Sequence, residues 1–129
     1  MKIEHVAIWT ADLETLKDFY KRYFQGMAGN RYTNPNTGFQ SYFLNFATEA
    51  RLEIMSMPAV SSSSGNGLTQ HFGLAHICFS VGTQEAVERL TQQLAEDGYP
   101  VLDGPRWTGD RYYESQILDP DGNRVEITI

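Results

Sequence analysis

Hydrophobic and polar residues alternate along residues 2–9, which is the pattern of a half-buried β-strand. Val6 and Ile8 point to one face of this strand. Its other face carries Ile3, His5, Ala7 and Trp9. Residues 74–81 alternate in the same way, and one of their two faces carries His76, Cys78 and Ser80. Each of these two segments is therefore expected to bury an apolar face and to present a histidine on the opposite face.

Both strands are followed by a segment with the spacing of an amphipathic helix. Asp12 and Thr83 are expected to cap these helices, because their side-chain oxygens accept hydrogen bonds from the free amides of a first turn. Gly26 and Gly98 are the expected stops. The two apolar stripes are Leu13, Leu16, Phe19, Tyr20, Tyr23 and Phe24 in the first helix, and Ala86, Val87, Leu90 and Leu94 in the second.

Three further strand candidates follow each helix. They cover about residues 29–34, 39–47 and 50–57 in the first half, and about residues 100–108, 111–118 and 123–129 in the second. Turn-forming residues at 34–38 and 119–123 separate neighbouring strands within each half. The order of elements is therefore βαβββ twice, and the sequence predicts an α+β fold built from two such modules.

A stretch of serine and glycine at residues 61–67 separates the two halves and has the composition of a flexible connector. With 129 residues, the chain is expected to form one domain over residues 1–129. Module one covers about residues 1–58, the connector about 60–70, and module two about 73–129. Two modules within one domain are expected to share a sheet or a core.

The charge balance excludes some classes of function. Ten basic residues against sixteen acidic residues give a net charge of −6, which opposes nonspecific binding to nucleic acid or to anionic lipid. No apolar run approaches the roughly 20 residues that cross a bilayer, and the N-terminus begins directly with a strand rather than with a leader. The single cysteine, Cys78, fits a reducing compartment. We therefore expect a cytoplasmic protein without nucleic-acid or membrane partners.

The two modules repeat a pair of residues that bind metals. His5 and Glu53 are 48 residues apart in the first half, and His76 and Glu126 are 50 residues apart in the second. In all four strands the histidine or glutamate lies opposite an apolar row. If both apolar rows lie under the helices, the four side chains face a common helix-free surface, and a curved sheet would bring them together.

Charge favours a cation at that point. Two ionised carboxylates gathered in a partly buried site repel each other, and one would take up a proton unless a cation lay between them. Two imidazoles and two carboxylates suit first-row divalent ions, and an octahedral ion keeps two open positions for substrate. Taken singly, a strand histidine or glutamate is more often structural or solvated. Four of them in register favour a metal site.

These residues resemble the vicinal oxygen chelate superfamily, which includes glyoxalase I, bleomycin resistance proteins and extradiol dioxygenases. The resemblance covers the whole chain. It rests on His5 in HVAIWTADLETLKDFY, Glu53 in RLEIM, His76 in HICFSV, and Glu126 in the closing ILDPDGNRVEITI. It implies two βαβββ modules that form an incomplete curved barrel around one divalent ion, either Ni, Co, Mn, Fe or Zn. It also implies a homodimer.

The ligand set His5, Glu53, His76 and Glu126 is most similar to that of glyoxalase I. The resemblance then implies a lyase or isomerase that acts on a small substrate with adjacent oxygens, through an enediolate. Glu126 or Glu53 would be the general base, with Glu126 preferred. The alternatives are a ring-cleaving dioxygenase, which usually has a three-residue ligand set, and a non-enzymatic small-molecule-binding protein of the resistance type.

Several other residues bear on the substrate. Many glutathione-using members of the superfamily have arginine four residues after the first ligand, where this chain has Trp9. Trp9 and Met55 lie on the ligand faces of their strands and are the expected substrate-binding residues. Arg51, Arg111 and Arg124 are candidates for binding an anion, although ion pairing on the surface is the more common role. Cys78 lies two residues after His76 and could face the pocket, but a small buried apolar residue is the preferred interpretation. His71 is expected not to be a ligand.

Overall fold

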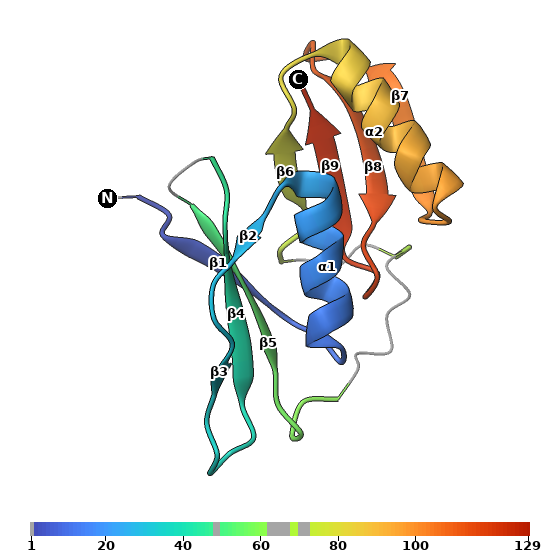
Figure 1. The fold of residues 1–129 in the computed structure, drawn as a ribbon. Helices are drawn as coiled ribbons and strands as arrows, with labels where there is room; N and C mark the ends of the chain where they lie inside the picture. The colour runs from blue at the N-terminus through green and yellow to red at the C-terminus, as the bar shows by residue number, and fades with distance from the viewer. Residues whose placement is uncertain (1, 48–49, 62–67, 70–72) are drawn as a thin grey trace. The chain divides into compact units, whose positions relative to one another are not determined.

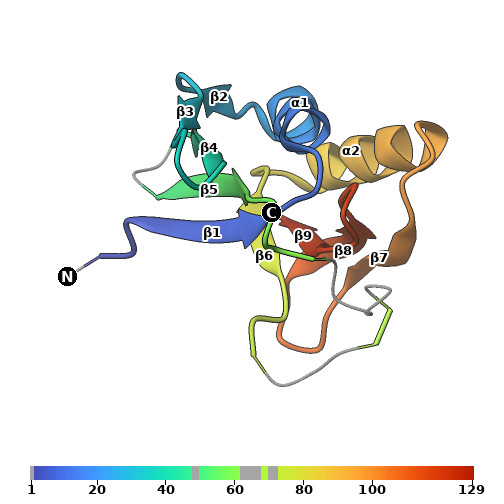
Figure 2. The same ribbon diagram turned by 90° about the horizontal axis from the view of Figure 1, so that it is seen from below.

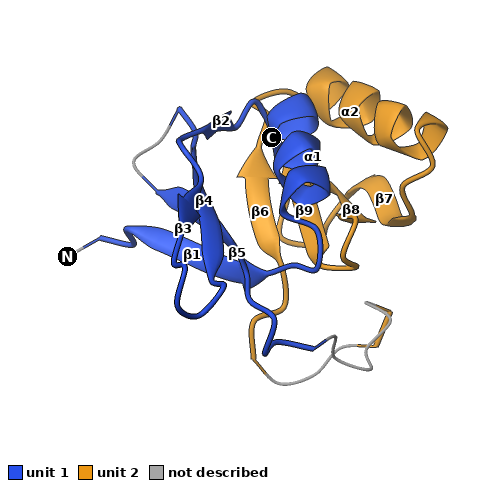
Figure 3. Ribbon diagram, turned by 60° about the horizontal axis from the view of Figure 1, so that its bottom comes forward, with its two compact units in different colours: residues 1–64 blue, residues 65–129 orange. Residues whose placement is uncertain are grey.

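The structure is a computed structural model that describes residues 2–47, 50–61, 68–69 and 73–129. The chain divides into two compact units, Met1–Ser64 and Gly65–Ile129, shown in different colours in Figure 3. Among these residues, each unit contains one helix and one sheet, so the protein has a mixed α+β fold (Figure 1). The division falls within the predicted Ser/Gly connector, most of which lies outside the described residues.

The first unit contains a sheet in which β1 pairs in parallel with β5, and β5 and β2 each pair antiparallel with β4. The short strand β3 also pairs with β4. The elements are β1 (His5–Trp9), α1 (Leu13–Phe24), β2 (Met27–Ala28), β3 (Tyr32–Thr33), β4 (Gln40–Asn45) and β5 (Arg51–Ser56). The parallel pairing of the first and last strands, with the helix between them in sequence, brings His5 next to the strand that carries Glu53.

Helix α1 begins and ends through identifiable local contacts. The side chain of Asp12 accepts hydrogen bonds from the amides of Glu14 and Thr15, which confirms it as the N-cap. The helix stops at Phe24 because Gln25 adopts a left-handed conformation, with φ of 57°. The expected stop at Gly26 is therefore displaced by one residue. The helix packs on β4 and β5, where its apolar stripe covers buried Leu44, Leu52 and Ile54.

The second unit repeats this plan. Its sheet has the order β6-β9-β8-β7, with β6 and β9 parallel and the other pairs antiparallel. The elements are β6 (Ile77–Ser80), α2 (Gln84–Glu96), β7 (Val101–Trp107), β8 (Tyr113–Leu118) and β9 (Arg124–Thr128). Figure 2 shows α2 running along one face of this sheet, where it contacts β7, β8 and β9.

The core of the second unit lies between α2 and its sheet. Thr83 caps the helix by accepting a hydrogen bond from the amide of Ala86, as predicted, and Gly98 follows its end with φ of 90°. The fully buried side chains facing each other across this core are Val87, Leu94, Ile117, Val125 and Ile127. Among the described residues, no helix is long and apolar enough to span a membrane.

Two details of the strands differ from the sequence prediction. The single strand expected at 29–34 is replaced by β2 and β3, which pair with opposite ends of β4. Gly29 lies between them, and its amide donates a 3.0 Å hydrogen bond to the carbonyl of Phe43. The predicted strand at 74–81 is also shorter, since β6 begins at Ile77 and leaves His76 immediately before it.

Candidate metal and substrate site

The first unit brings His5 and Glu53 together, and we call this pair the first half-site. In the parallel register of β1 and β5, Ala7 lies opposite Glu53, and His5 lies two residues earlier on the same face. The imidazole Nε2 of His5 is 3.9 Å from the carboxylate Oε2 of Glu53. The residue between them on this face, Ala7, has a small side chain.

The imidazole of His5 has neighbours on its other sides. Its Nδ1 contacts the carboxylate of Glu4, which also pairs with the guanidinium of Arg51. The hydrogen bond from His5 lowers the pKa of Glu4, and the pairing with Arg51 adds to this effect. The ring of Phe43 meets the imidazole edge-on, with 5.5 Å between ring centroids. The orientation of His5 is therefore fixed by contacts within its own unit.

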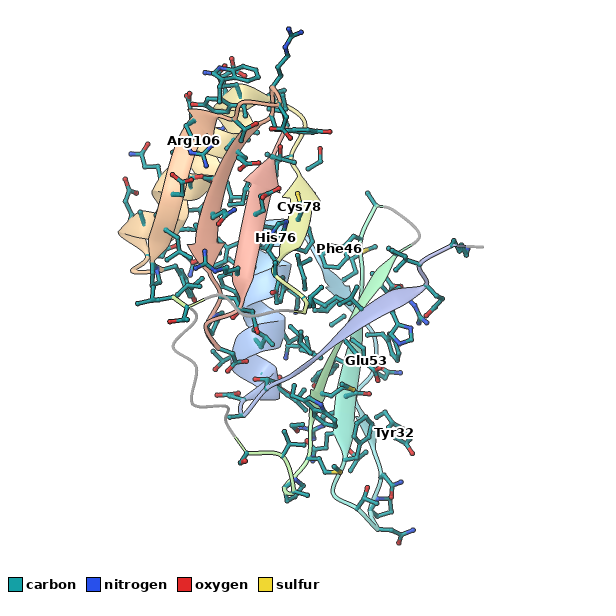
Figure 4. All side chains as sticks on the ribbon, turned by 180° about the vertical axis from the view of Figure 1, so that it is seen from behind. Tyr32, Phe46, Glu53, His76, Cys78 and Arg106 are labelled. Atoms are coloured by element: carbon teal, nitrogen blue, oxygen red, sulfur yellow. The ribbon has the colours of Figure 1, made fainter. Side chains whose placement is uncertain are left out.

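The second unit brings His76 and Glu126 together in the same way, and we call this pair the second half-site. Cys78 lies opposite Glu126 in the parallel register of β6 and β9, two residues after His76. The Nε2 of His76 is 3.6 Å from the Oε2 of Glu126. Figure 4 labels His76 and Cys78 at β6, and Glu53 on β5 of the first unit.

The surroundings of Glu126 are polar. The side-chain amide of Gln116, its register partner on β8, donates a 3.4 Å hydrogen bond to its Oε2. Desolvation, followed by a hydrogen bond to Glu126, raises the pKa of the Cys78 thiol to about 12. The thiol therefore stays protonated at neutral pH and donates to the carboxylate. The expectation that Cys78 is a buried residue is wrong, because strand alternation places it on the exposed ligand face with His76.

A further carboxylate lies on the same face of the second sheet. Glu114 is opposite Thr128 in register, one step along β8 from Gln116 on that face. Desolvation and repulsion from Glu126 raise the pKa of Glu114, while Arg106 opposes the increase. Negative charge thus accumulates on this face of the second sheet.

The donor groups of both half-sites fit a first-row divalent ion. Neighbouring ligands of an octahedral ion with bonds of about 2.1 Å are roughly 3 Å apart. The separations of 3.9 Å and 3.6 Å exceed that value and are longer than a normal hydrogen bond, so each pair would move slightly closer to share one ion. Within the described residues of either unit, no group of three or more His, Cys, Asp or Glu side chains forms a metal site by itself. Each unit therefore holds two of the four predicted ligands.

The predicted substrate-binding residues lie next to the first half-site. Trp9 and Met55 are register partners, two residues beyond Ala7 and Glu53 on the same face. Trp9 is 43% exposed and meets Phe39 edge-on, with 6.1 Å between ring centroids. Phe39 also contacts Tyr32 at 6.0 Å. The first half-site therefore continues into an exposed aromatic surface.

Two of the three candidate anion-binding arginines bond to other groups of the protein. Arg51 pairs with Glu4, and Arg124 donates to the side chain of Gln116 at 3.3 Å and to the carbonyl of Leu68 at 2.8 Å. Arg111 adopts a left-handed backbone conformation, with φ of 74°, in the turn before β8. His71 lies outside the described residues.

The sequence prediction did not include Glu4, Phe43, Gln116 or Glu114. Phe43 and Gln116 occupy equivalent positions, since each is the register partner of a site glutamate on the neighbouring antiparallel strand. Strand alternation would have placed them on the ligand faces once these registers were known. Glu4 is adjacent to His5 in the sequence, and this adjacency alone could have predicted a contact between the two side chains.

The sequence matches the model of the Glyoxalase/Bleomycin resistance protein/Dioxygenase superfamily over residues 2–127. No curated protein matches the chain.

The fold is similar to those of several solved structures. A possible glyoxalase from Bacillus cereus shares 23% identity with a TM-score of 0.72, and the alignment covers 100% of this chain and 99% of that chain. Glyoxalase I from Leishmania major shares 19% identity with a TM-score of 0.78, covering 99% of this chain and 86% of that one. A glyoxylase/bleomycin resistance protein/dioxygenase domain from Frankia sp. EAN1pec shares 16% identity with a TM-score of 0.82, and the alignment covers 100% of this chain and 97% of that chain. At these identities the likeness supports the fold.

Proposed function

Since the chain belongs to the glyoxalase/bleomycin resistance protein/dioxygenase superfamily, we propose that it is a divalent-metal-dependent, glyoxalase-like lyase or isomerase. Its substrate is a small molecule with adjacent oxygens, which reacts through an enediolate. One observation carries this proposal: two His–Glu pairs occur at equivalent register positions in two units of the same chain.

One ion shared by the two half-sites would use all four donors, His5, Glu53, His76 and Glu126. Two neutral imidazoles and two carboxylates balance the charge of a divalent cation, which relieves the repulsion around Glu126. Nitrogen and oxygen donors of this kind suit Ni, Co, Mn, Fe or Zn. When bound, such an ion polarises the adjacent oxygens of a substrate and stabilises the negative charge that forms as a C–H proton leaves.

Glu126 is the proposed general base, with Glu53 as the second candidate. The two carboxylates differ in their neighbours, because Glu126 lies beside the polar groups of Gln116 and Cys78, whereas Glu53 lies beside the ring of Phe43. The amide and the thiol both donate to the Glu126 carboxylate. To act as the base, Glu126 would leave the ion, accept a substrate proton and return it to the neighbouring carbon.

The aromatic surface beside the first half-site is the proposed contact for the non-reacting part of the substrate. Trp9 and Met55 offer a flat apolar surface, and Phe39 supports the indole of Trp9. An apolar surface at this place disfavours the carboxylates of glutathione. Thiol adducts with apolar or aromatic substituents are therefore the preferred substrates.

A homodimer is part of the proposal. The superfamily resemblance supports this assembly, in which the two modules pair within one chain or are exchanged between two chains. Light scattering coupled to size-exclusion chromatography measures the molar mass directly. A mass twice that of the 14.6 kDa chain is expected, and a monomer at all concentrations would contradict it.

A direct assay combines metal loading with a panel of thiols. The protein is loaded with each candidate metal, mixed with methylglyoxal and one thiol at a time, and thioester formation is followed by absorbance. We expect turnover by the wild type, loss of turnover in Glu126→Gln, and normal turnover in Glu85→Gln, an exposed glutamate on α2. Oxygen consumption with catechols and no thioester would instead identify a dioxygenase. Metal binding without turnover of any substrate would identify a binding protein.

A further inference from the structure

The two half-sites have the same register but different supporting residues. His5 lies opposite Arg51 in the pairing of β1 and β5. Extending the pairing of β6 and β9 by one residue places His76 opposite Arg124. Both units therefore have an arginine beside the histidine. The partners of the two arginines are different, and this difference defines two ways of supporting a ligand.

In the first unit, Arg51 acts on the histidine through Glu4. The Glu4 carboxylate contacts the guanidinium of Arg51 with one oxygen and the Nδ1 of His5 with the other. The backbone also holds Glu4 in place, since the amide of Arg51 donates a 3.0 Å hydrogen bond to the Glu4 carbonyl. Glu4 is thus held to β5 at two points, through its backbone carbonyl and through its carboxylate, which also contacts the imidazole.

This contact determines which nitrogen of His5 carries a proton. An ionised carboxylate only accepts hydrogen bonds, so a neutral imidazole must place its proton on Nδ1 to bond with Glu4. The lone pair is then on Nε2, which is the nitrogen that faces Glu53. Many metal-binding histidines are oriented by a carboxylate on the other ring nitrogen in this way.

Aromatic contacts complete the support of His5. Phe43 meets the imidazole at an interplanar angle of 89°, and the guanidinium carbon of Arg51 lies 4.2 Å from the centroid of the Phe43 ring. Arg51 thus contacts both groups that touch the imidazole, Glu4 and Phe43. Rotation of the ring away from Glu53 would break contacts with both.

The described residues of the second unit contain no counterpart of this arrangement. The residue before His76 is Ala75, whose side chain has no hydrogen-bond acceptor. Arg124 instead donates to Gln116, and Gln116 donates to Glu126. The arginine therefore supports the histidine in the first unit and the glutamate in the second.

We propose that Glu4 and Arg51 are positioning residues that hold His5 as the Nδ1–H tautomer, with Nε2 directed at the metal. This inference rests on the proposed function for the presence of a metal, while the tautomer is a property of the metal-free protein. It assigns to the first half-site a pre-oriented nitrogen donor.

The test uses two independent readouts on the full chain. Nitrogen-15 NMR of the metal-free protein, at a pH where the imidazole is neutral, reports the tautomer of His5. Competition between the protein and a chromophoric chelator for Co²⁺ reports metal affinity. We expect an Nδ1–H signature in the wild type that is lost in Glu4→Ala, together with affinity weakened roughly 10- to 100-fold.

Two further variants separate positioning from general charge effects. Glu4→Gln keeps an oxygen that accepts from Nδ1–H but loses the ion pair with Arg51, so its affinity should fall between the wild type and Glu4→Ala. Glu14→Ala removes a carboxylate on α1 that pairs with Lys17 and should leave both readouts unchanged. Since Glu4 and Glu14 are both exposed, the variants should fold, and a circular dichroism spectrum of each variant checks this.

The outcomes distinguish this inference from the proposed function. A wild-type protein that binds no Co²⁺ would contradict the proposed metal site. The NMR spectrum would then still test the tautomer of His5, because that measurement uses the metal-free protein. A wild type that binds Co²⁺ as tightly as Glu4→Ala, with the same tautomer in both proteins, would overturn the positioning role while leaving the metal site intact.

Discussion

The Nε2 of His76 lies 3.6 Å from the Oε2 of Glu126, although the direct register partner of Glu126 on β6 is Cys78. The same diagonal relationship joins His5 to Glu53 across Ala7 in the first unit. The repeat in the sequence is therefore also a repeat in geometry. This follows because in each module the first and last strands are parallel neighbours, and a fixed offset places the histidine one pleat away from the glutamate.

Removing a buried side chain next to either glutamate should destabilise the protein strongly. Ile54 and Ile127 follow Glu53 and Glu126 and are fully buried beneath the sheets. We expect Ile54→Ala and Ile127→Ala each to lower the free energy of unfolding by about 2–5 kcal/mol, because each leaves a cavity. Urea denaturation measures the change. The matched control is Ile3→Ala at a 71% exposed position, which should change stability by less than about 0.5 kcal/mol.

A loss below about 1 kcal/mol in both buried variants would contradict the packing of these residues under the helices. A loss in only one would mean that the two units are not packed equivalently.

Neutralising Glu114 should stabilise the metal-free protein at neutral pH. Its pKa is raised in the folded state by desolvation and by Glu126, so the ionised carboxylate is penalised on folding. This penalty is absent well below the ordinary pKa of 4.5, grows as the pH rises from there towards the higher folded pKa, and is complete above it. Glu114→Gln should therefore raise the thermal unfolding midpoint at pH 7 and have little effect in acid.

The control for that experiment is Glu85→Gln, which removes an exposed carboxylate from the first turn of α2. An equal shift in Glu114→Gln at both pH values would show that the effect is unrelated to ionisation.

Local features of this fold could be predicted from the sequence. Asp12 and Thr83 were identified as helix caps because the bonds that define a cap involve residues two or three positions away. The ligand faces were also predictable, since strand alternation is a local property. Strand alternation places Cys78 on the same face as His76. The preferred interpretation of Cys78 as a buried residue is wrong because the cysteine is exposed.

Features that depend on strand register could not be predicted. Gln116 and Phe43 lie beside the site glutamates only because β8 and β4 pair with the ligand strands at particular offsets. The division of the expected strand at 29–34 depends on Gly29 bonding to the carbonyl of Phe43, which is also a cross-strand contact. Such contacts involve residues far apart in the chain and are not specified by local hydrophobic spacing.

Replacing Trp9 should change substrate preference more than turnover. An aromatic contact of about 0.5–1.5 kcal/mol corresponds to a change in affinity of roughly two- to tenfold. Trp9→Ala should raise KM by that factor for thiol adducts with aromatic substituents, and leave KM for small polar adducts nearly unchanged. Steady-state kinetics with both adduct types measures the effect.

Trp107→Ala is the matched control, because Trp107 is an exposed tryptophan that contacts Tyr113, whose hydroxyl bonds to Glu88 on α2. An equal rise in KM for polar and aromatic adducts in Trp9→Ala would contradict a specific aromatic contact.

The number of divalent ions bound per chain, measured by elemental analysis after metal loading and dialysis, tests whether the two half-sites share one ion. We expect one ion per chain in the wild type, and loss of that ion both in His5→Ala and in His76→Ala. Two ions per chain, no ion, or full retention of metal when either histidine is replaced would contradict a shared ion.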